Sequence, residues 1–146
     1  MPHRRLFPVL VPLALALSAF AAAACGAGGA SSTVPPALVT GEWGGDHAGL
    51  IATSGGGTME YDCATGFITE PIRPSPDGGI SVTGTHTPGH GGPVRIDEVL
   101  PQRPARYTGR VDGEHLTLTV VMTDSNVTVG TFELYHGRSA RVFKCL

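Results

Sequence analysis

The sequence predicts an all-β fold, namely an up-and-down antiparallel barrel of eight or nine strands. Apolar and polar residues alternate with a period of two in several segments, most clearly over residues 116–123 (LTLTVVMT), which is typical of half-buried strands. Clusters of Gly, Asp, Asn and Ser separate these segments, and no stretch of useful length has helical periodicity. Short sequential hairpins favour a meander, and closing the meander into a barrel protects its edges. A β-sandwich is the alternative architecture.

The chain opens with an expected export signal over residues 1–24. Arg4 and Arg5 precede an apolar run over residues 6–20, which two prolines interrupt and which is short for a membrane-spanning helix. Residues 22–25 (AAAC) resemble the lipobox of bacterial lipoproteins, and this resemblance implies a lipid-modified Cys25 and a membrane anchor. Cleavage by an ordinary signal peptidase is the alternative. We therefore expect an exported protein, either anchored as a lipoprotein or released as a periplasmic or secreted one.

Two further segments follow the expected signal. Residues 25–37 consist mainly of Gly, Ala, Ser, Thr and Pro, which predicts a flexible linker. Residues 38–146 have the length of a single domain. The chain has 10 Lys and Arg against 12 Asp and Glu, and removal of the signal would lower only the basic count. This acidic balance argues against nucleic acid as a partner.

Up to nine strands are expected along the domain, each bounded by turn residues. They begin near Val39, Gly49, Thr58, Gly66, Ile80, Ala105, Leu116, Val127 and Ala140. Asp112 and Gly113 predict a two-residue hairpin turn of type I′, because both residue types tolerate a positive φ. Gly84 and Gly109 lie inside expected strands, where a glycine indicates a sharp bend or close packing and hence a strongly coiled sheet.

The three cysteines constrain both the fold and the compartment. An odd number in an exported protein leaves one cysteine unpaired, and a modified Cys25 would leave Cys63 and Cys145 to form a disulfide in an oxidising compartment. Each of these two ends an alternating segment, so the bond would tie an early strand to the end of the domain. Two separate buried thiols are the alternative, and neither cysteine lies in a motif that would make it a nucleophile.

The first expected strand carries a family resemblance. Gly41, Glu42 and Trp43 resemble the Gly-x-Trp signature of the lipocalins, which implies that Trp43 closes the floor of the barrel beneath an arginine, here Arg141. A wider likeness joins the chain to a group of small exported bacterial proteins through residues 43–47, 61–63, 90–95, 104–107, 130–132 and 144–146. The likeness implies export and a compact β domain, and it carries no activity.

One long connection, residues 87–103, is the expected place for a ligand-binding loop, because hairpin loops are usually much shorter. The candidate residues at this loop are His86, His90, Arg95, Asp97 and Glu98. The interpretation that we favour is a loop whose charges serve solubility, and a lid or rim over one end of the barrel is the alternative. Pro88 rules out a helix that would place His86 and His90 on one face, so we assign no metal site.

Three classes of function are open to such a domain. The first is a cell-envelope lipoprotein that acts by binding or protein interaction, and the second is a carrier of a small hydrophobic ligand, as lipocalin likeness implies. An enzyme ranks last, because no catalytic serine or zinc motif is present, and we assign no catalytic residue or cofactor. An apolar cavity above about 300 Å³ would favour the carrier. A packed interior with exposed apolar residues would favour a protein partner.

Overall fold

The computed structural model describes residues 37–93, 95 and 97–145, and it confirms the expected fold. The described chain is all-β and forms a closed, antiparallel, up-and-down barrel of eight strands. The expectations for the signal, for Cys25 and for nearly all of the linker lie outside these residues. The strands are β1 (Gly41–Gly44), β2 (Ala48–Thr53), β3 (Gly56–Tyr61), β4 (Ala64–Ile68), β5 (Gly79–Pro88), β6 (Arg103–Asp112), β7 (His115–Met122) and β8 (Val127–His136).

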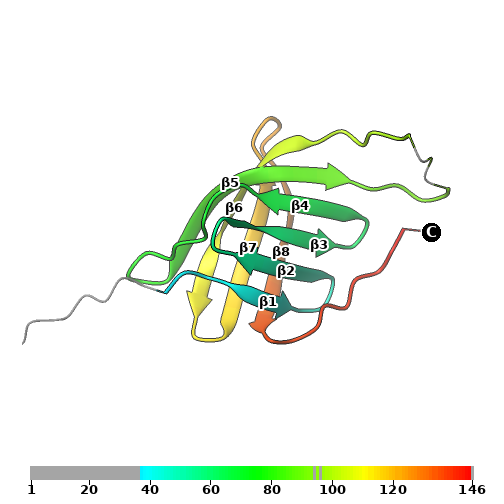
Figure 1. Cartoon of the computed structure of the whole chain (residues 1–146). Helices are drawn as coiled ribbons and strands as arrows, with labels where there is room; N and C mark the ends of the chain where they lie inside the picture. Colours follow the sequence, from blue (N-terminus) through cyan, green and yellow to red (C-terminus); the bar gives the residue numbers. More distant parts are fainter. Residues whose placement is uncertain (1–36, 94, 96, 146) are drawn as a thin grey trace, which may run out of the picture. The chain divides into compact units, whose positions relative to one another are not determined.

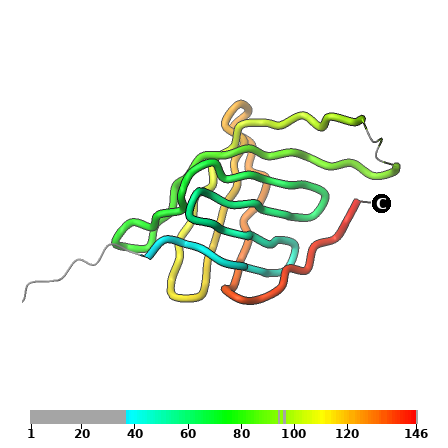
Figure 2. The backbone as a smooth tube through the Cα atoms, viewed as in Figure 1, coloured from blue at the N-terminus to red at the C-terminus, as the bar shows by residue number. Residues whose placement is uncertain are grey.

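Each strand pairs with the next one in the sequence, and β8 returns to β1. In Figure 1, β1 to β4 lie side by side while β6 to β8 cross behind them. Strand β5 pairs with both β4 and β6, and it therefore joins the two groups. The backbone trace in Figure 2 shows the long β5–β6 connection and the C-terminal segment at the same end of the barrel.

The barrel interior is filled by its own side chains. Alternation along the strands sends every second residue inward, which is the pattern expected from residues 116–123. The most deeply buried large side chains are Tyr107, Leu50, Met59, Ile72, Leu116, Leu118, Leu134 and Val120. These residues belong to one continuous apolar cluster, so the barrel is a packed core and not a lumen.

Close packing explains the glycine inside β5. Gly84 lies opposite Ile68 of β4 and Ala105 of β6. A Cβ atom at this position would stand 2.0 Å from the carbonyl oxygen of Phe67 and 3.0 Å from the Tyr107 ring. The close approach that the sequence predicts at a mid-strand glycine is therefore present where β5 passes from one group of strands to the other.

The β6–β7 hairpin turns one residue later than expected. Gly113 and Glu114 connect Asp112 to His115, which lie opposite each other in the ladder. Gly113 has a φ of 58°, whereas Glu114 is not among the residues with positive φ. A positive φ at the first central residue alone belongs to a type II′ turn, so the expected type I′ turn at Asp112 and Gly113 is wrong.

The expected ninth strand near Ala140 is absent from the described residues. Residues 138–145, which we call the C-terminal strap, cross the ends of β1, β2 and β3 with a single parallel bridge, Asp46 to Arg141. The strap lies over glycines that carry no side chain to hold it away: a Cβ on Gly44 would be 2.1 Å from the Arg138 carbonyl oxygen, and one on Gly49 would be 2.5 Å from the Ala140 Cβ.

Candidate functional site

The barrel is closed by a short seam between its first and last strands. β8 pairs with β7 along its whole length, but it pairs with β1 only at Tyr135 and His136. Every other pair of neighbouring strands shares at least four residue pairs. Within the described part of the chain, the preceding residues of β8 therefore have no ladder partner on the side away from β7.

The seam is short because the chain turns away from β8 directly after the last residue of β1. Gly45 donates its N–H to the carbonyl of Ala48 in a tight turn, and His47 adopts a positive φ of 70°. A Cβ on Gly45 would stand 2.0 Å from the carbonyl oxygen of Glu133, so this turn can pass the edge of β8 only with glycine at this position.

The direction of each backbone N–H and C=O group of β8 follows from the alternation of successive residues along the strand. His136 donates its N–H to the carbonyl of Glu114 and thus faces β7, whereas the Glu133 carbonyl faces Gly45 across the seam. Since both backbone groups of a strand residue point to the same side and successive residues alternate, the N–H and C=O of Thr131 also face the seam. No strand of the described chain pairs with Thr131 or Glu133 on this side. The Gly45 turn packs against the Glu133 carbonyl, so the uncovered part of the edge is at Thr131.

A groove runs beside this edge. It has a volume of about 560 Å³ and lies between β8 and the β1–β2 turn. Its walls are formed by Asp46, His47, Thr131, Phe132, Glu133, Tyr135 and Arg138. The exposed backbone of β8 and the groove together form one feature, which we call the seam groove.

The sequence of the edge suits strand pairing. From Val127 to Phe132 the strand carries no charge, and it contains the β-branched and aromatic residues that favour extended backbone. A bulge at Val129 interrupts the β7–β8 ladder, because Val120 lies opposite Gly130 and Val121 lies opposite Thr128. The regular part of the free edge therefore begins at Gly130.

Apolar side chains are also exposed elsewhere on the barrel wall. Ile51 of β2 is 62% exposed and Phe67 of β4 is 42% exposed. Both lie opposite Thr58 of β3, so they stand in one outward row across three strands. The structure thus combines a packed interior with exposed apolar residues.

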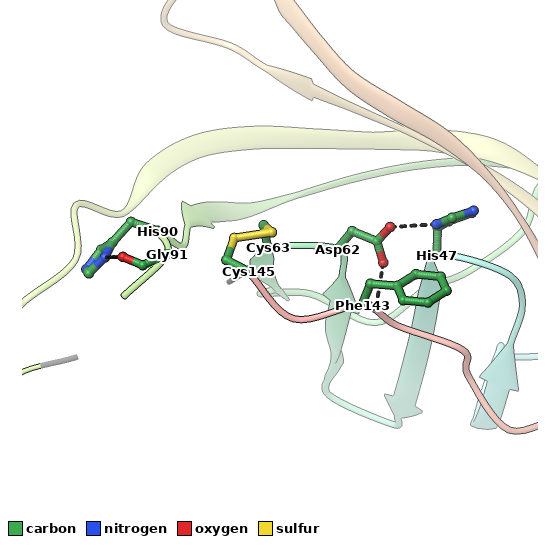
Figure 3. Close-up of a disulfide and its surroundings, with 7 residues drawn as sticks. All are labelled: His47, Asp62, Cys63, His90, Gly91, Phe143 and Cys145. Atoms are coloured by element: carbon green, nitrogen blue, oxygen red, sulfur yellow. Dashed lines mark hydrogen bonds and ion pairs between the residues drawn. A yellow bond between two sulfur atoms is a disulfide. The ribbon is translucent and has the colours of Figure 1, made fainter. Parts of the chain in front are cut away.

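The disulfide predicted between Cys63 and Cys145 is present, with an S–S distance of 2.06 Å. It ties the β3–β4 turn to the end of the strap (Figure 3). Beside it, Oδ1 of Asp62 accepts a hydrogen bond from the Phe143 N–H at 2.8 Å, and Oδ2 lies 2.5 Å from Nδ1 of His47. The Phe143 N–H, followed by His47, lowers the pKa of the Asp62 carboxyl group.

The long loop keeps its charged residues largely paired with one another. Nε2 of His90 lies 2.6 Å from Glu98, and the hydrogen bonds to the Gly91 carbonyl and to Glu98 raise the pKa of His90. Arg95 and Asp97 are exposed, with Nε and Oδ1 3.8 Å apart. The four candidate residues on this loop therefore form two charge pairs. The pairs are linked through the backbone, because the Arg95 N–H donates to the Glu98 carboxylate at 3.3 Å and the Glu98 N–H donates to the Arg95 carbonyl at 3.1 Å.

The fifth candidate, His86, lies inside the barrel and not in the loop. Strand β5 continues to Pro88, and alternation turns the His86 side chain inward, where it is 6% exposed. Its Nδ1 lies 3.1 Å from the hydroxyl of Tyr61, which in turn lies 3.3 Å from the hydroxyl of Tyr107. Sequence reasoning missed this polar cluster, although the period-two pattern continues through His86.

The directions of these hydrogen bonds follow from the number of available protons. Tyr107 donates its one hydroxyl proton to the Thr85 carbonyl at 2.7 Å, so it accepts from Tyr61. Tyr61 then has no proton left for the histidine, and His86 must donate from Nδ1. Burial, followed by Arg103, lowers the pKa of His86, while burial raises the pKa of both tyrosines. All three groups are neutral at physiological pH.

A smaller cavity of about 270 Å³ lies under the long loop. Ala64, Leu100 and the disulfide form apolar parts of its wall. Thr87 also lines this cavity, and its buried hydroxyl has no hydrogen-bond partner among the described residues.

The two residues singled out by lipocalin likeness do not meet as expected. Trp43 is buried, and its indole lies 4.9 Å from the His136 ring between the two centroids, while Nε1 donates to the Thr40 carbonyl. The guanidinium of Arg141 is instead 3.3 Å from Asp46 and largely exposed. We therefore correct the expected Trp43–Arg141 closure: His136 is the aromatic neighbour of Trp43, and Arg141 fastens the strap.

Comparisons with known proteins leave the family open. No family model matches the chain, and neither a curated protein nor a solved structure is significantly similar to it. Across the described ranges, no three His, Cys, Asp or Glu side chains are grouped as metal ligands would be. The same residues contain no helix with the length and apolar character needed to cross a membrane.

Proposed function

We propose that this protein is an exported binding domain of the cell envelope that holds an extended segment of a partner polypeptide by strand addition at the seam groove. The observation that carries the proposal is the backbone of Thr131, which faces the groove without a ladder partner and next to the Gly45 turn. In strand addition, such backbone groups provide affinity and flanking hollows accept alternate side chains of the incoming strand.

The packed interior supports a role at the surface. Seventeen apolar side chains of the described residues are buried in one cluster that fills the interior of the barrel. The exposed Ile51 and Phe67 add apolar surface that a protein partner would cover.

The sequence and the disulfide support a location outside the cytoplasm for this activity. The Cys63–Cys145 bond is typical of an oxidising compartment, which agrees with the expected export signal. A lipid on Cys25 would hold the domain at a membrane surface, where its partner would be another envelope protein.

A substitution that removes the backbone N–H of Thr131 provides the test. Thr131→Pro removes an N–H that faces the seam and not β7, so the barrel should remain folded. Thr131→Val is the matched control, because it keeps this N–H while removing the same side-chain hydroxyl. A photo-crosslinking residue at Glu133, introduced into each background in the host cell, should give a discrete adduct in the wild type and in Thr131→Val.

The adduct should disappear in Thr131→Pro and should not form from a crosslinker placed at Ser81, which lies on β5. An adduct of equal yield from the proline variant would contradict strand addition. Circular dichroism of the purified variants would verify that both retain the barrel.

A small-molecule carrier is the second candidate, favoured by the cavity of about 270 Å³ and the unpartnered hydroxyl of Thr87 within its wall. This cavity is slightly below the roughly 300 Å³ that small-molecule pockets usually reach. Native mass spectrometry of the protein purified from its host would reveal a bound hydrophobic molecule, and Leu100→Trp should then displace it. Recovery of the bare protein mass would argue against this candidate.

A further inference from the structure

The C-terminal strap is attached to the barrel by few interactions. Each of residues 138–145 is exposed or only half-buried, so the strap contributes no side chain to the core. Its backbone bonds to the β1–β2 turn are Arg141 N–H to Gly45 C=O and His47 N–H to Arg141 C=O, at 2.9 and 2.8 Å. Segments with so few buried contacts open at low free energy unless a covalent bond holds them.

Neither cysteine of the covalent bond at the end of the strap is buried. Cys63 is exposed and Cys145 is half-buried, in contrast to a disulfide sealed inside a core. Other contacts at this end are the Phe143 N–H bond to Asp62, the Cys63 N–H bond to the Phe143 carbonyl at 3.4 Å, and the exposed ion pair between Lys144 and Glu60. An exposed disulfide allows a thiolate to approach a sulfur atom directly.

The strap also supports one wall of the seam groove. Asp46, in that wall, pairs with Arg138 and Arg141, whose nitrogens lie 3.7 and 3.3 Å from Oδ1. His47, in the same wall, donates its N–H to the strap at Arg141, and its ring lies 5.5 Å from the Phe143 ring between centroids. The strap and the wall are therefore held together.

We propose that the Cys63–Cys145 disulfide is a reversible lock whose reduction frees the strap and thereby unlocks the Asp46–His47 wall of the seam groove. This lock would regulate access to the seam groove. The release of the strap can be tested by itself, whereas its effect on partner binding rests on the proposed function. Loss of the strap also exposes the Gly45 carbonyl and the His47 N–H, which become further backbone groups available to an incoming strand.

The reductant is a protein dithiol. Its thiolate attacks Sγ of Cys63, the more exposed residue of the pair, and displaces Cys145 as a thiolate, which takes up a proton. The second thiol of the reductant then attacks the mixed disulfide and releases Cys63. Two electrons and two protons pass from the dithiol to the disulfide, which leaves the reductant oxidised. The reverse exchange with an oxidised partner closes the lock again.

Limited tryptic digestion tests the lock without any knowledge of the partner. The strap contains cleavage sites after Arg138 and Arg141, while Arg106 and Arg110 lie within β6 and report opening of the barrel. After reduction with dithiothreitol, cleavage in the strap should accelerate by about tenfold or more, as expected for local opening, with the β6 sites still protected. Lys144→Gln, which removes the neighbouring ion pair but keeps the disulfide, should leave cleavage after Arg138 unchanged.

Amide hydrogen exchange tests the link to the wall. On reduction, the His47 amide should exchange at least about tenfold faster, while the amides of β7, which exchange by global unfolding, should remain much slower than the His47 amide. The double variant Cys63→Ser, Cys145→Ser should reproduce the reduced pattern.

Three outcomes would overturn the proposal: a strap that stays protected after reduction, cleavage at the β6 sites as fast as cleavage in the strap, or an unchanged His47 amide. These readouts need no partner. Failure of the crosslinking experiment with a working lock would thus contradict strand addition alone.

Discussion

Nδ1 of His86 donates a hydrogen bond to the hydroxyl of Tyr61 across 3.1 Å, inside an otherwise apolar barrel. The bond fixes the histidine in one neutral tautomer and begins a chain that passes through Tyr107 to the Thr85 carbonyl. An unpaired polar group in a core lowers stability, so this chain makes the interior sensitive to protonation and to loss of a hydroxyl.

Acid should destabilise the protein through His86. Its pKa is lowered in the folded state from the ordinary value of 6.5, so the unfolded chain binds more protons once the pH falls below that value. As the pH falls from 6.5 to the lowered pKa of the folded state, the unfolding free energy should therefore decrease. Above pH 6.5 the histidine is neutral in both states, so it adds no pH dependence there. Urea unfolding at pH 7.5, 6.5 and 5.5 should show a smaller loss in His86→Gln than in the wild type.

His90 provides a contrast of opposite sign. Its pKa is raised in the folded state, so its contribution to stability is present below pH 6.5 and is lost as the pH rises through the raised value. His90→Gln should consequently make the loss of stability on acidification steeper than in the wild type. Equal slopes in the wild type and both variants would contradict these assignments.

Removing the Tyr107 hydroxyl should cost stability. Tyr107→Phe leaves the Thr85 carbonyl without its donor and Tyr61 without its acceptor, which should lower the unfolding free energy by about 1 to 3 kcal/mol. Tyr135→Phe is the matched control, because this side chain is 42% exposed and should change stability by less than about 0.5 kcal/mol. Chemical denaturation at pH 7.5 measures both, and equal effects would argue against the internal chain.

A methyl group at Gly44 should displace the strap. The Cβ of Gly44→Ala would stand 2.1 Å from the Arg138 carbonyl oxygen, so the backbone must shift, at a cost of about 1 to 3 kcal/mol. Gly55→Ala has no atom within 4 Å of its new Cβ and should be nearly neutral. Thermal melts of the oxidised proteins compare the two, and a neutral Gly44→Ala would contradict the described course of the strap.

The disulfide should add to global stability as well as hold the strap. It joins residues separated by 82 positions, which on the chain-entropy estimate stabilises the fold by about 4 to 5 kcal/mol. Cys63→Ser, Cys145→Ser should lower the denaturation midpoint accordingly while retaining the β spectrum at 25 °C. A midpoint identical to that of the oxidised wild type would show that the bond does not form.

The alternating pattern and the turn residues were sufficient to predict the barrel, because the inward face of each strand can be recognised from its own sequence. In β7, for example, the apolar Leu116 and Leu118 mark the inward face. The disulfide was predictable because Cys63 and Cys145 were the two cysteines left for the folded domain. His86 was misplaced because Pro88 and the glycines after it indicate a loop, although the strand continues to Pro88 itself.

The seam groove could not be predicted from the sequence. Its existence depends on how few residues β1 shares with β8, and that number is set by the turn at Gly45 and His47 passing beside Glu133. Likewise, the segment after Ala140 alternates as a strand would, but it meets the β1–β2 turn at a single bridge. Both features arise from contacts between distant parts of the chain, which local patterns do not encode.

Hydrogen exchange along β8 of the free protein tests the central claim most directly. If the seam is open, the amides of Thr131 and Glu133 exchange rapidly while those of Phe132 and Leu134, which face β7, stay protected, so protection alternates from one residue to the next. Uniform protection from Thr131 to Leu134 would mean that another strand covers this edge, and the site for strand addition would not exist.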